Sequence, residues 1–555
     1  MARKNTMPVI DILELEYQLA ELPSSQHRAG LAGLVLMVQW LKRQGSHQGI
    51  CDITRLDERG ATLRINQDGL AALFDELYAA SNEEQESTKL FKDRQKNIKP
   101  PLREETRTEI NPKSGKERTK TVYIYPVVVP KGAFLVDVDP SASGDNGLWI
   151  KLWRDVIWSI FRGIPATRKP FEDRAAGKKN KDAADVWKDL QQPSDYPIEL
   201  PSTYFIGAQA ANAENVPFKD RARFQFLLHF WPYAAQIYVP SVIDNENERQ
   251  FVGYALAIPD IANLEWFCEE WTQVLHARGV ERSGFRPKDS VVDLAVESAL
   301  DMLKRLRERL TLHTGAQATS DLILGIDVVH VNKQGNNIKT LGIARIDPEL
   351  RMIDDYTRIK DSLWNPHFRR QRLLNLVNNR AWHAGFDSIM CRLPYEQSIE
   401  NNAFRHDARE SFRQEIQQIT EEEENVMMTD DLLSEVADSK SHHNAQLSYE
   451  ELVYRVISIY VQRRLKSKYQ LEWAAVKNNP SELKEYSEAK EKITRDAFLA
   501  IRSRSGMDFI DYFASTLCSV SQPLSEQQYV SLAQALYNDT DKVRTLTMLA
   551  LSARS

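Results

Sequence analysis

The residues that could perform chemistry are few and lie far apart in this chain. "RHDAR" (405–409) contains a His–Asp pair of the kind that binds metal in phosphohydrolases, and "SHH" (441–443) places two histidines in a polar stretch. "VDVDP" (136–140) supplies two carboxylates at the end of an expected strand. A metal-dependent reaction needs further ligands that converge on the same ion, and none accompanies these groups. We interpret the first as a solvated helix face and the other two as polar segments.

Sequence motifs for nucleotide, peptide and ester chemistry are missing as well. The chain has no Gly-rich phosphate loop followed by Lys-Ser/Thr, no HExxH and no Gly-x-Ser-x-Gly. Its cysteines form no CxxC pair, which favours free thiols in a reducing compartment over a structural zinc site. The first residues lack the apolar segment of a signal peptide, and the longest apolar run, 30–41, is too short to span a bilayer. We expect a cytoplasmic protein without a catalytic site, cofactor, metal or membrane anchor.

Local excesses of positive charge say more about nucleic-acid binding than the net charge of the chain does. The chain has 72 basic and 78 acidic residues, so a surface for nucleic acid must arise from segregation of these charges. Within residues 86–120, the stretch from Lys89 to Lys120 contains eleven basic and five acidic residues, and three prolines interrupt this stretch. Residues 168–188 form a second basic, Gly-interrupted segment. We interpret both as loops, either solvated or in contact with phosphates.

Two further basic clusters lie near the ends of expected helices in the C-terminal part. "QRRLKSKYQ" (462–470) and "AIRSRSG" (500–506) contribute Arg463, Arg464, Lys466, Lys468, Arg502 and Arg504. Each cluster alone is also typical of a solvated helix end. Together with the two basic loops, they favour a nucleic-acid-binding scaffold over an enzyme.

The elements that must position these residues indicate an α+β fold. The expected elements are a helix at 22–45, a hairpin at 50–66, a helix at 68–81, strands at 121–139, a Trp-rich helix at 147–163, buried strands within 223–260, helices within 262–312 and a hairpin at 321–347 that turns at Gln334–Asn337. In the Trp-rich helix, Trp149, Trp153 and Phe161 are expected in the core.

From residue 365 onward every signal is helical. The expected helix starts carry Ser448 with Glu451, Asn479 with Pro480, and Ser525 with Gln528. Short connections between such helices favour a bundle. We predict a mixed α/β body at 1–425 and an all-helical bundle at 427–555, with the acidic run before Met427 as the linker.

Two stretches carry a family resemblance. "LPSSQHRAGLAGLVL" near the N-terminus, and "RSRSGMDFIDYFASTLCSVSQPL" followed by "VRTLTMLALSA", resemble the start and the end of the large subunit of type I CRISPR Cascade complexes. The resemblance is to the MYXAN branch, related to subtype I-B. Chain length and the order of the two parts also fit this family.

The resemblance implies a non-catalytic subunit that recognises the protospacer-adjacent motif (PAM) on target duplex DNA and stabilises the R-loop, while guide pairing reads the sequence. It implies an N-terminal domain beside the 5′ handle of the crRNA and a bundle that resembles the Cascade small subunit. The implied partners are crRNA, target double-stranded DNA, the backbone, handle-end and small subunits, and a helicase-nuclease or transposition proteins. No membrane is implied.

Candidate contacts follow from this implied role and from side-chain chemistry. The crRNA-handle or backbone candidates are Gln26, His27, Arg28, Lys42 and Arg43, and the PAM-reading candidates are Lys131, Gln209, Asn212 and Asn215. The six basic residues of the C-terminal clusters are candidates for the backbone of an R-loop strand. Two other hypotheses remain open: a metal-dependent nuclease or nucleotide-processing enzyme of the same defence system, and a scaffold without nucleic-acid contact.

The stretch "EEEENVMM" (421–428) indicates an internal translation start. In subtype I-B systems the small subunit is often made from such a start within the large-subunit gene. Glutamate codons are purine-rich and can contain a ribosome-binding sequence, and Asn425 and Val426 then separate it from Met427 by two codons. A product from Met427 would hold 129 residues.

Replacing the codons for Met427 and Met428, with silent changes in the glutamate codons, should abolish a short product on a blot of C-terminally tagged protein. A GUG codon at Val426 is the rival start and is replaced in a parallel variant. A short product that survives replacement of all three codons would contradict internal initiation at this place.

Overall fold

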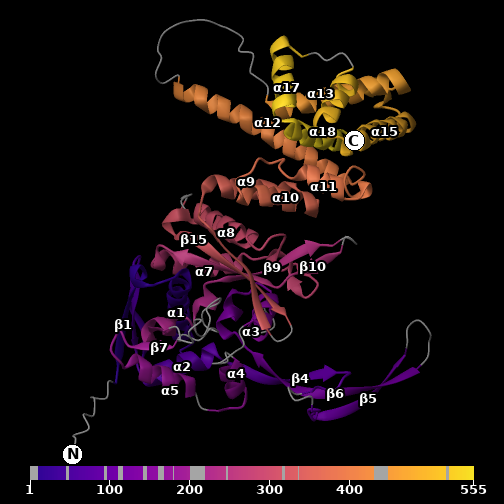
Figure 1. Ribbon diagram of the computed structural model, residues 1–555. Coiled ribbons are helices and arrows are strands. Elements are labelled where there is room, and N and C mark those ends of the chain that lie inside the picture. The colour runs from indigo at the N-terminus through magenta and orange to yellow at the C-terminus, as the bar shows by residue number, and fades with distance from the viewer. Residues whose placement is uncertain are drawn as a thin grey trace, which may run out of the picture. The chain divides into compact units, whose positions relative to one another are not determined.

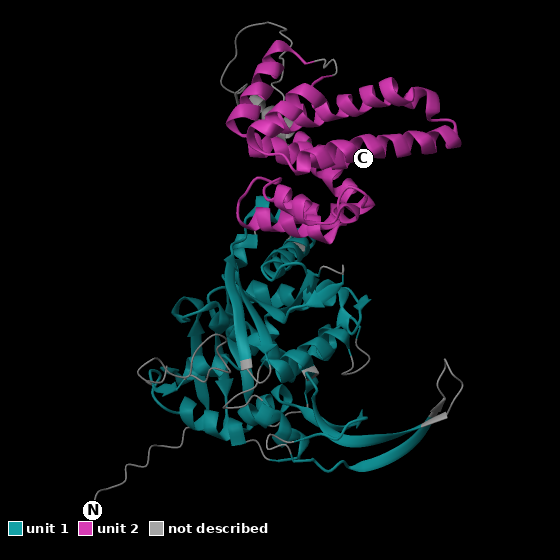
Figure 2. Cartoon of the chain, turned by 45° about the vertical axis from the view of Figure 1, so that its right-hand side comes forward, with its two compact units in different colours: residues 1–353 teal, residues 354–555 magenta. Residues whose placement is uncertain are grey.

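The computed structural model describes residues 11–45, 49–92, 97–110, 117–141, 147–160, 168–178, 181–199, 219–244, 248–314, 319–334, 337–430, 448–519 and 524–555. Two units divide the chain between Ile353 and Asp354 (Figure 2). The N-terminal unit is residues 1–353 and the C-terminal unit is residues 354–555. Sheets with covering helices in the first unit and helices in the second confirm the α+β class (Figure 1).

A central sheet organises the N-terminal unit. Its strands are β10 (Arg249–Phe251), β9 (Gln236–Ile243), β11 (Tyr254–Ile261), β15 (Ile323–Gln334) and β16 (Asn337–Ile346), paired antiparallel in that order, with β14 (Val291–Val292) parallel to β9. Every residue of β11 is buried, as expected for a middle strand. Gln334 pairs with Asn337, which confirms the predicted hairpin. The helices α7 (Leu264–His276) and α8 (Glu297–Thr314) confirm the helices predicted within 262–312.

The predicted first helix forms as α1 (Ser25–Gln44). The side chain of Ser24 accepts a hydrogen bond from the backbone N–H of His27, and Gly45 ends the helix at φ +64°. A Cβ on Gly30 would lie 2.4 Å from the carbonyl oxygen of Leu227, and one on Gly33 only 2.1 Å from that of Phe230. Only glycine therefore lets α1 approach this neighbouring backbone so closely.

The other elements of this unit are short. The predicted hairpin forms as β2 (Cys51–Asp57) and β3 (Gly60–Ile65), joined by β1 (Leu13–Gln18) in the order β1-β3-β2 and followed by α2 (Gln67–Leu77). Two small sheets pair β7 (Pro197–Glu199) with β8 (Lys219–Arg221) and β12 (Arg282–Ser283) with β13 (Arg286–Pro287). The Trp-rich helix is α3 (Leu148–Ser159), in which Trp149 and Trp153 are buried as predicted. Phe161 lies outside the described residues.

The first basic segment, 86–120, was expected as a loop, but its described part is largely sheet. The strands β4 (Ala80–Ser87), β6 (Glu117–Pro130) and β5 (Arg103–Ile110) pair antiparallel in that order and extend as an arm (Figure 1). Arg103 and Arg107 form ion pairs across the sheet with glutamates of β4. β4 and β5 lie on either side of β6, so these ion pairs reach across it. The two outer strands therefore form without apolar alternation of their own, against a middle strand that carries the buried Val122 and Ile124.

Three other predictions were also wrong in detail. The second basic segment, 168–188, forms α4 (Arg168–Ala175) and α5 (Lys181–Leu190), because Trp187 and Leu190 lie on one buried helix face. Residues 133–138 were expected as a strand, but they follow the left-handed Gly132 as a 3-10 helix. The apolar run that begins at 223 was predicted as a strand, but it opens with the helix α6 (Ala222–Leu227). The prediction failed because a short apolar run in a sequence does not distinguish a buried helix from a buried strand.

The C-terminal unit is helical throughout its described residues. Its α-helices are α9 (Leu350–Ser362, which crosses the unit boundary), α10 (Pro366–Val377), α11 (Phe386–Arg392), α12 (Asn402–Asp430), α13 (Tyr449–Arg464), α14 (Trp473–Val476), α15 (Pro480–Arg502), α16 (Gly506–Tyr512), α17 (Glu526–Asn538) and α18 (Thr540–Arg554). The π-helical turns Leu465–Tyr469 and Phe513–Leu517 continue α13 and α16. α18 is buried all round and packs against α12, α13 and α15, so it forms the core of this unit.

The predicted helix starts are correct, but the unit boundary differs from the predicted one. Ser448, Asn479 and Ser525 each accept a hydrogen bond from the first turn of their helices, and Ser525 with Gln528 makes a full capping box. The predicted boundary at 425–427 lies inside α12 rather than in a linker. Glutamate and methionine favour helix, and α12 and α11 both pack against α18, which joins the residues from 354 onward to this unit.

Candidate nucleic-acid interface

The start of α1 brings three of the predicted handle contacts into the interior. His27 is only 3 % exposed, and its Nε2 lies 3.0 Å from Oδ2 of Asp220. Gln26 is buried beside it. Arg28 lies 2.5 Å from Asp260 and donates through Nε to the carbonyl oxygen of Leu19 at 3.1 Å. These side chains hold α1 in place within the N-terminal unit.

The same contacts continue across the central sheet. The Ser25 hydroxyl donates to Asp327 on β15 at 2.6 Å. Arg345 on β16 lies 2.9 Å from Asp260 and 3.5 Å from Asp327. Two buried or half-buried carboxylates are thus shared between α1 and β16, which satisfies charges that would be costly to bury alone.

The other end of α1 is open to solvent. Lys42 and Arg43 are exposed, and Lys42 lies 2.9 Å from Asp52 on β2. An exposed pair of this kind contributes little to stability and exchanges easily for a phosphate. Of the five predicted handle contacts, Lys42 and Arg43 are therefore the accessible ones, with Arg28 partly exposed.

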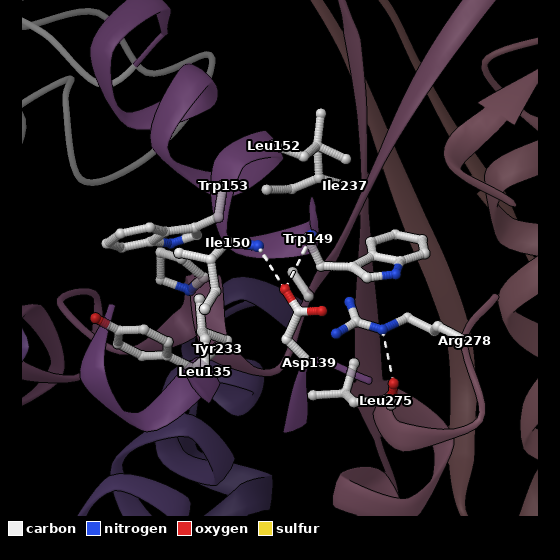
Figure 3. A pocket seen from close by; sticks show the side chains of 12 residues that line it. Leu135, Asp139, Trp149, Ile150, Leu152, Trp153, Tyr233, Ile237, Leu275 and Arg278 are labelled. Carbon is white, nitrogen blue, oxygen red and sulfur yellow. Dashed lines mark hydrogen bonds between the residues drawn. The ribbon is translucent and has the colours of Figure 1, made fainter. Parts of the chain in front are cut away.

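The carboxylates of "VDVDP" have structural roles, and Figure 3 shows that of Asp139. Asp137 accepts a hydrogen bond from Nε1 of Trp40 at 2.9 Å. Asp139 accepts from the backbone N–H groups of Trp149 and Ile150, both at 3.0 Å, at the start of α3. A carboxylate at this place also stabilises the positive end of the helix dipole.

Arg278 lies beside the same helix start and lines a small pocket with Trp149 (Figure 3). Its guanidinium stacks 4.1 Å from the indole centroid, and its Nε donates to the carbonyl oxygen of Leu275. Burial lowers the pKa of Arg278 to about 9, which the nearby Asp139 opposes. The pocket therefore joins α3 to the segment after α7, and its charged groups are engaged in the fold.

The arm carries charge that is largely paired. Arg103 contacts both carboxylate oxygens of Glu84 at 2.6 Å, and Arg107 makes the equivalent contact with Glu86. Glu105 contacts both arginines. The Arg103 guanidinium lowers the pKa of Glu84 below its usual range. Since each arginine already has carboxylate partners, the described part of the arm presents a less basic surface than its composition predicts.

Of the four PAM-reading candidates, Lys131 lies within the described residues. Lys131 follows β6 and is half-buried, with its Nζ 3.6 Å from Glu83. Gln209, Asn212 and Asn215 lie outside the described residues. Their role as base-reading contacts stays a prediction.

The C-terminal clusters meet around two tyrosines. Arg464 lies 5.6 Å from the ring of Tyr460, and Arg504 lies 4.7 Å from the ring of Tyr512. Burial raises the pKa of Tyr512 to about 12, and both arginines are close enough to oppose this shift. The fold thus brings Arg464 and Arg504 together, although forty residues separate them in the sequence.

The remaining four residues of these clusters differ in how accessible their charged groups are to a ligand. Arg463 is exposed, Lys466 pairs with Glu472 at 2.6 Å, and Lys468 lies 5.6 Å from the ring of Tyr469. Arg502 instead donates to the carbonyl oxygens of Cys391 and Leu393, so it joins α15 to α11. Backbone carbonyls of its own unit thus hold Arg502, and Arg504 also donates to one, the carbonyl oxygen of Ala500.

A third group of cations was missed from the sequence. Arg405 and Arg409 on α12, Lys490 on α15 and Arg554 on α18 lie near one another. Arg409 donates to the carbonyl oxygen of Ala553 at 3.2 Å, and Lys490 donates to that of Ser555 at 3.3 Å. These bonds stabilise the last turn of α18 but leave the positive charges in place. In the sequence, the four-residue spacing of the arginines in "RHDARESFR" was the signal from which part of this cation group could have been predicted.

The His–Asp pair of this segment is part of the fold. Asp407 is buried and accepts hydrogen bonds from the backbone N–H groups of Trp364 and Asn365. Within the described ranges, His, Cys, Asp and Glu form no group of three or more that could hold a metal ion. In the same ranges, no helix has both the length and the apolar character needed to cross a membrane.

Comparisons with known proteins also divide the chain in two, but between residues 316 and 323 rather than between Ile353 and Asp354. Residues 50–316 match the model of the type I-B CRISPR Cas8b N-terminal domain, and residues 323–554 match that of the Cas8b C-terminal domain. No curated protein matches the chain. The two matches define the class of the protein as a large subunit of a CRISPR Cascade complex, a class that is generally non-catalytic. The chain belongs to the Cas8b family of type I-B CRISPR systems.

The crowding of cations around Lys490 predicts a pH-dependent stability. Burial, followed by Arg554, Arg409 and Arg405, lowers the pKa of Lys490 to about 8, while Glu491 pairs with Arg405 nearby. Between this pH and about 10.5, the unfolded chain binds more protons at this residue than the folded chain. The contribution of Lys490 to the free energy of unfolding therefore rises with pH across this window.

Lys490→Arg provides the matched comparison, because an arginine keeps its proton throughout this range. We expect the free energy of unfolding of the unsubstituted protein, relative to this variant, to increase from about pH 7.5 to pH 10. Denaturant unfolding at several pH values measures it. A difference in free energy of unfolding between the two proteins that stays constant over this pH range would contradict the lowered pKa of Lys490.

Proposed function

We propose that this protein is the Cascade large subunit that recognises the PAM on target duplex DNA and stabilises the R-loop. The observation that carries the proposal is the pair of Cas8b matches, which together extend from residue 50 to residue 554. The cation groups of the C-terminal unit support it, because phosphates are bound by local excesses of Lys and Arg. In the proposed division of labour, the guide reads the sequence and the protein reads a short motif and backbone shape.

Each unit has a proposed part in this function. In the N-terminal unit, Lys42 and Arg43 are proposed to contact the crRNA handle, while Lys131 and the amides of 209–215 contact the PAM duplex. In the C-terminal unit, Arg463, Arg464, Lys466, Lys468 and Arg504 are proposed to contact strand phosphates. The proposed partners are crRNA, target DNA, the other Cascade subunits and either a helicase-nuclease or transposition proteins, in the cytoplasm. Assignment to the MYXAN branch and to RNA-guided transposition remain part of this proposal.

The internal start remains a proposal as well, and the helix boundaries specify which elements its product would contain. Val426, Met427 and Met428 lie in α12, so a product that begins there would keep α13 to α18. It would lack Arg409, whose guanidinium contacts the end of α18. A separately translated small subunit would therefore keep the contact of Lys490 with Ser555 but lose that of Arg409 with Ala553.

Selection from a library of target duplexes tests the proposed function. The duplexes carry one target matched to the guide and a randomised flank, and the assembled complex is used with and without this subunit. We expect the complete complex to enrich one flanking motif and the incomplete complex to enrich none, because the motif is read by this protein. Sequencing of the bound fraction measures the enrichment, and a guide without a match in the library is the control. Equal enrichment by both complexes would contradict the proposal.

A further inference from the structure

Trp364 is an exposed aromatic residue held in a fixed position. It exposes 62 % of its surface and lies between α9 and α10. The buried carboxylate of Asp407 accepts hydrogen bonds from the backbone N–H of Trp364 at 2.9 Å and from that of Asn365 at 2.7 Å. Asn365 in turn caps α10 through its side chain. The backbone at Trp364 is therefore tied down, although its indole faces solvent.

The indole is also stacked on one side. The ring of His406 lies parallel to it, with centroids 3.7 Å apart and an angle of 5° between the planes. Asp407 fixes this ring too, since its Oδ1 lies 3.1 Å from Nδ1 of His406. One face of the indole is covered by the imidazole, so much of the exposed area belongs to the opposite face. A single buried carboxylate thus orients both members of the stack.

Cations continue from this stack along α12. Arg405, Arg409 and Arg413 recur at intervals of four residues, which places them along one side of α12, and Arg409 and Arg413 follow His406 by three and seven residues. Arg409 and Arg413 are exposed. Arg405 pairs with Glu491 at 3.0 Å, and the contact of Arg409 with a backbone carbonyl leaves its charge unopposed. The row extends about 12 Å along the helix, long enough for more than one phosphate.

An exposed aromatic face beside a row of arginines is the combination that binds single-stranded nucleic acid. The aromatic ring stacks on a base and the arginines contact the phosphates of the same strand. Bases inside a duplex have their faces covered by their neighbours, so the ring selects an unpaired strand. An apolar protein segment would not need the arginines, and an acidic segment would not need the free indole face.

We infer that Trp364, with Arg405, Arg409 and Arg413, forms a site at which one unpaired nucleotide stacks on the indole while its flanking phosphates lie along α12. The inference rests on the proposed function and assigns a place in the C-terminal unit where a single strand of the R-loop is held. DNA and RNA share the chemistry that this site recognises.

Binding of labelled oligonucleotides to the full-length chain tests the site. The probes are an oligothymidylate and an oligouridylate of about 15 nucleotides and a duplex of equal length, measured by fluorescence anisotropy. We expect Trp364→Ala to weaken binding of a single strand about 5- to 100-fold, and Trp364→Phe to retain most of the affinity. Trp473→Ala is the matched control, because Trp473 is another exposed tryptophan of this unit, at 56 %, and lies outside α12.

Arg413→Gln provides a second variant that leaves the stack and its hydrogen bonds intact. We expect it to reduce the slope of log affinity against log salt concentration by about 0.7, the value for one phosphate contact on a single strand. A loss for both oligonucleotides supports the shared chemistry, and a loss for one alone identifies the strand as DNA or RNA. Unchanged binding by Trp364→Ala, or an equal loss in Trp473→Ala, would overturn the inference, as would equal dependence of duplex binding on Trp364.

This experiment separates the site from the proposed function. Failure of the complete complex to select a flanking motif would contradict PAM recognition while leaving the oligonucleotide result unaffected. Full single-strand binding by Trp364→Ala in a complex that still selects a motif would contradict only the site. Thermal unfolding of each variant shows whether the chain remains folded, and the salt dependence of Arg413→Gln carries the test if the alanine variant does not fold.

Discussion

The attachment of α1 to the central sheet is the interaction on which the N-terminal unit depends. Gly30 and Gly33 let the helix approach the backbone at residues 227–230 so closely that no side chain fits between them. At the start of the helix, Arg28 shares the carboxylate of Asp260 with Arg345. A buried carboxylate with two cationic partners is strongly destabilising once either partner is lost, so these contacts fix the helix, the sheet and the exposed far end of α1 together.

The C-terminal unit shows the opposite electrostatic situation. α18 forms its core, and four cations lie near the end of that helix with Glu491 as a nearby carboxylate. Burial, and then repulsion by the like charges around it, disfavours the charged form of Lys490 in the folded state and lowers its pKa. A bound polyanion relieves this repulsion, since each phosphate supplies the missing opposite charge. The unit is thus built at some cost to its own stability around a surface suited to nucleic acid.

Much of the fold could be predicted from local signals, whereas most of the interface depends on contacts distant in sequence. The caps at Ser448, Asn479 and Ser525 and the hairpin at Gln334–Asn337 are encoded within a few residues. The outer strands of the arm, β4 and β5, were missed because they carry Arg–Glu pairs rather than apolar alternation. His27 was expected at the surface because its partner Asp220 lies 193 residues away. The cation group was missed because α12, α15 and α18 meet only in the folded chain.

The most direct measurement is an experimental structure of the assembled complex bound to a target with a complete R-loop. The account predicts that nucleic acid contacts both units of this subunit, with duplex DNA beside the motif at the N-terminal unit and an unpaired strand along α12. The proposed binding of nucleic acid by this subunit would then be explained by two surfaces with different chemistry on one chain. A structure in which every nucleic-acid contact is made by other subunits, with α12 and the exposed end of α1 both facing solvent, would contradict the account.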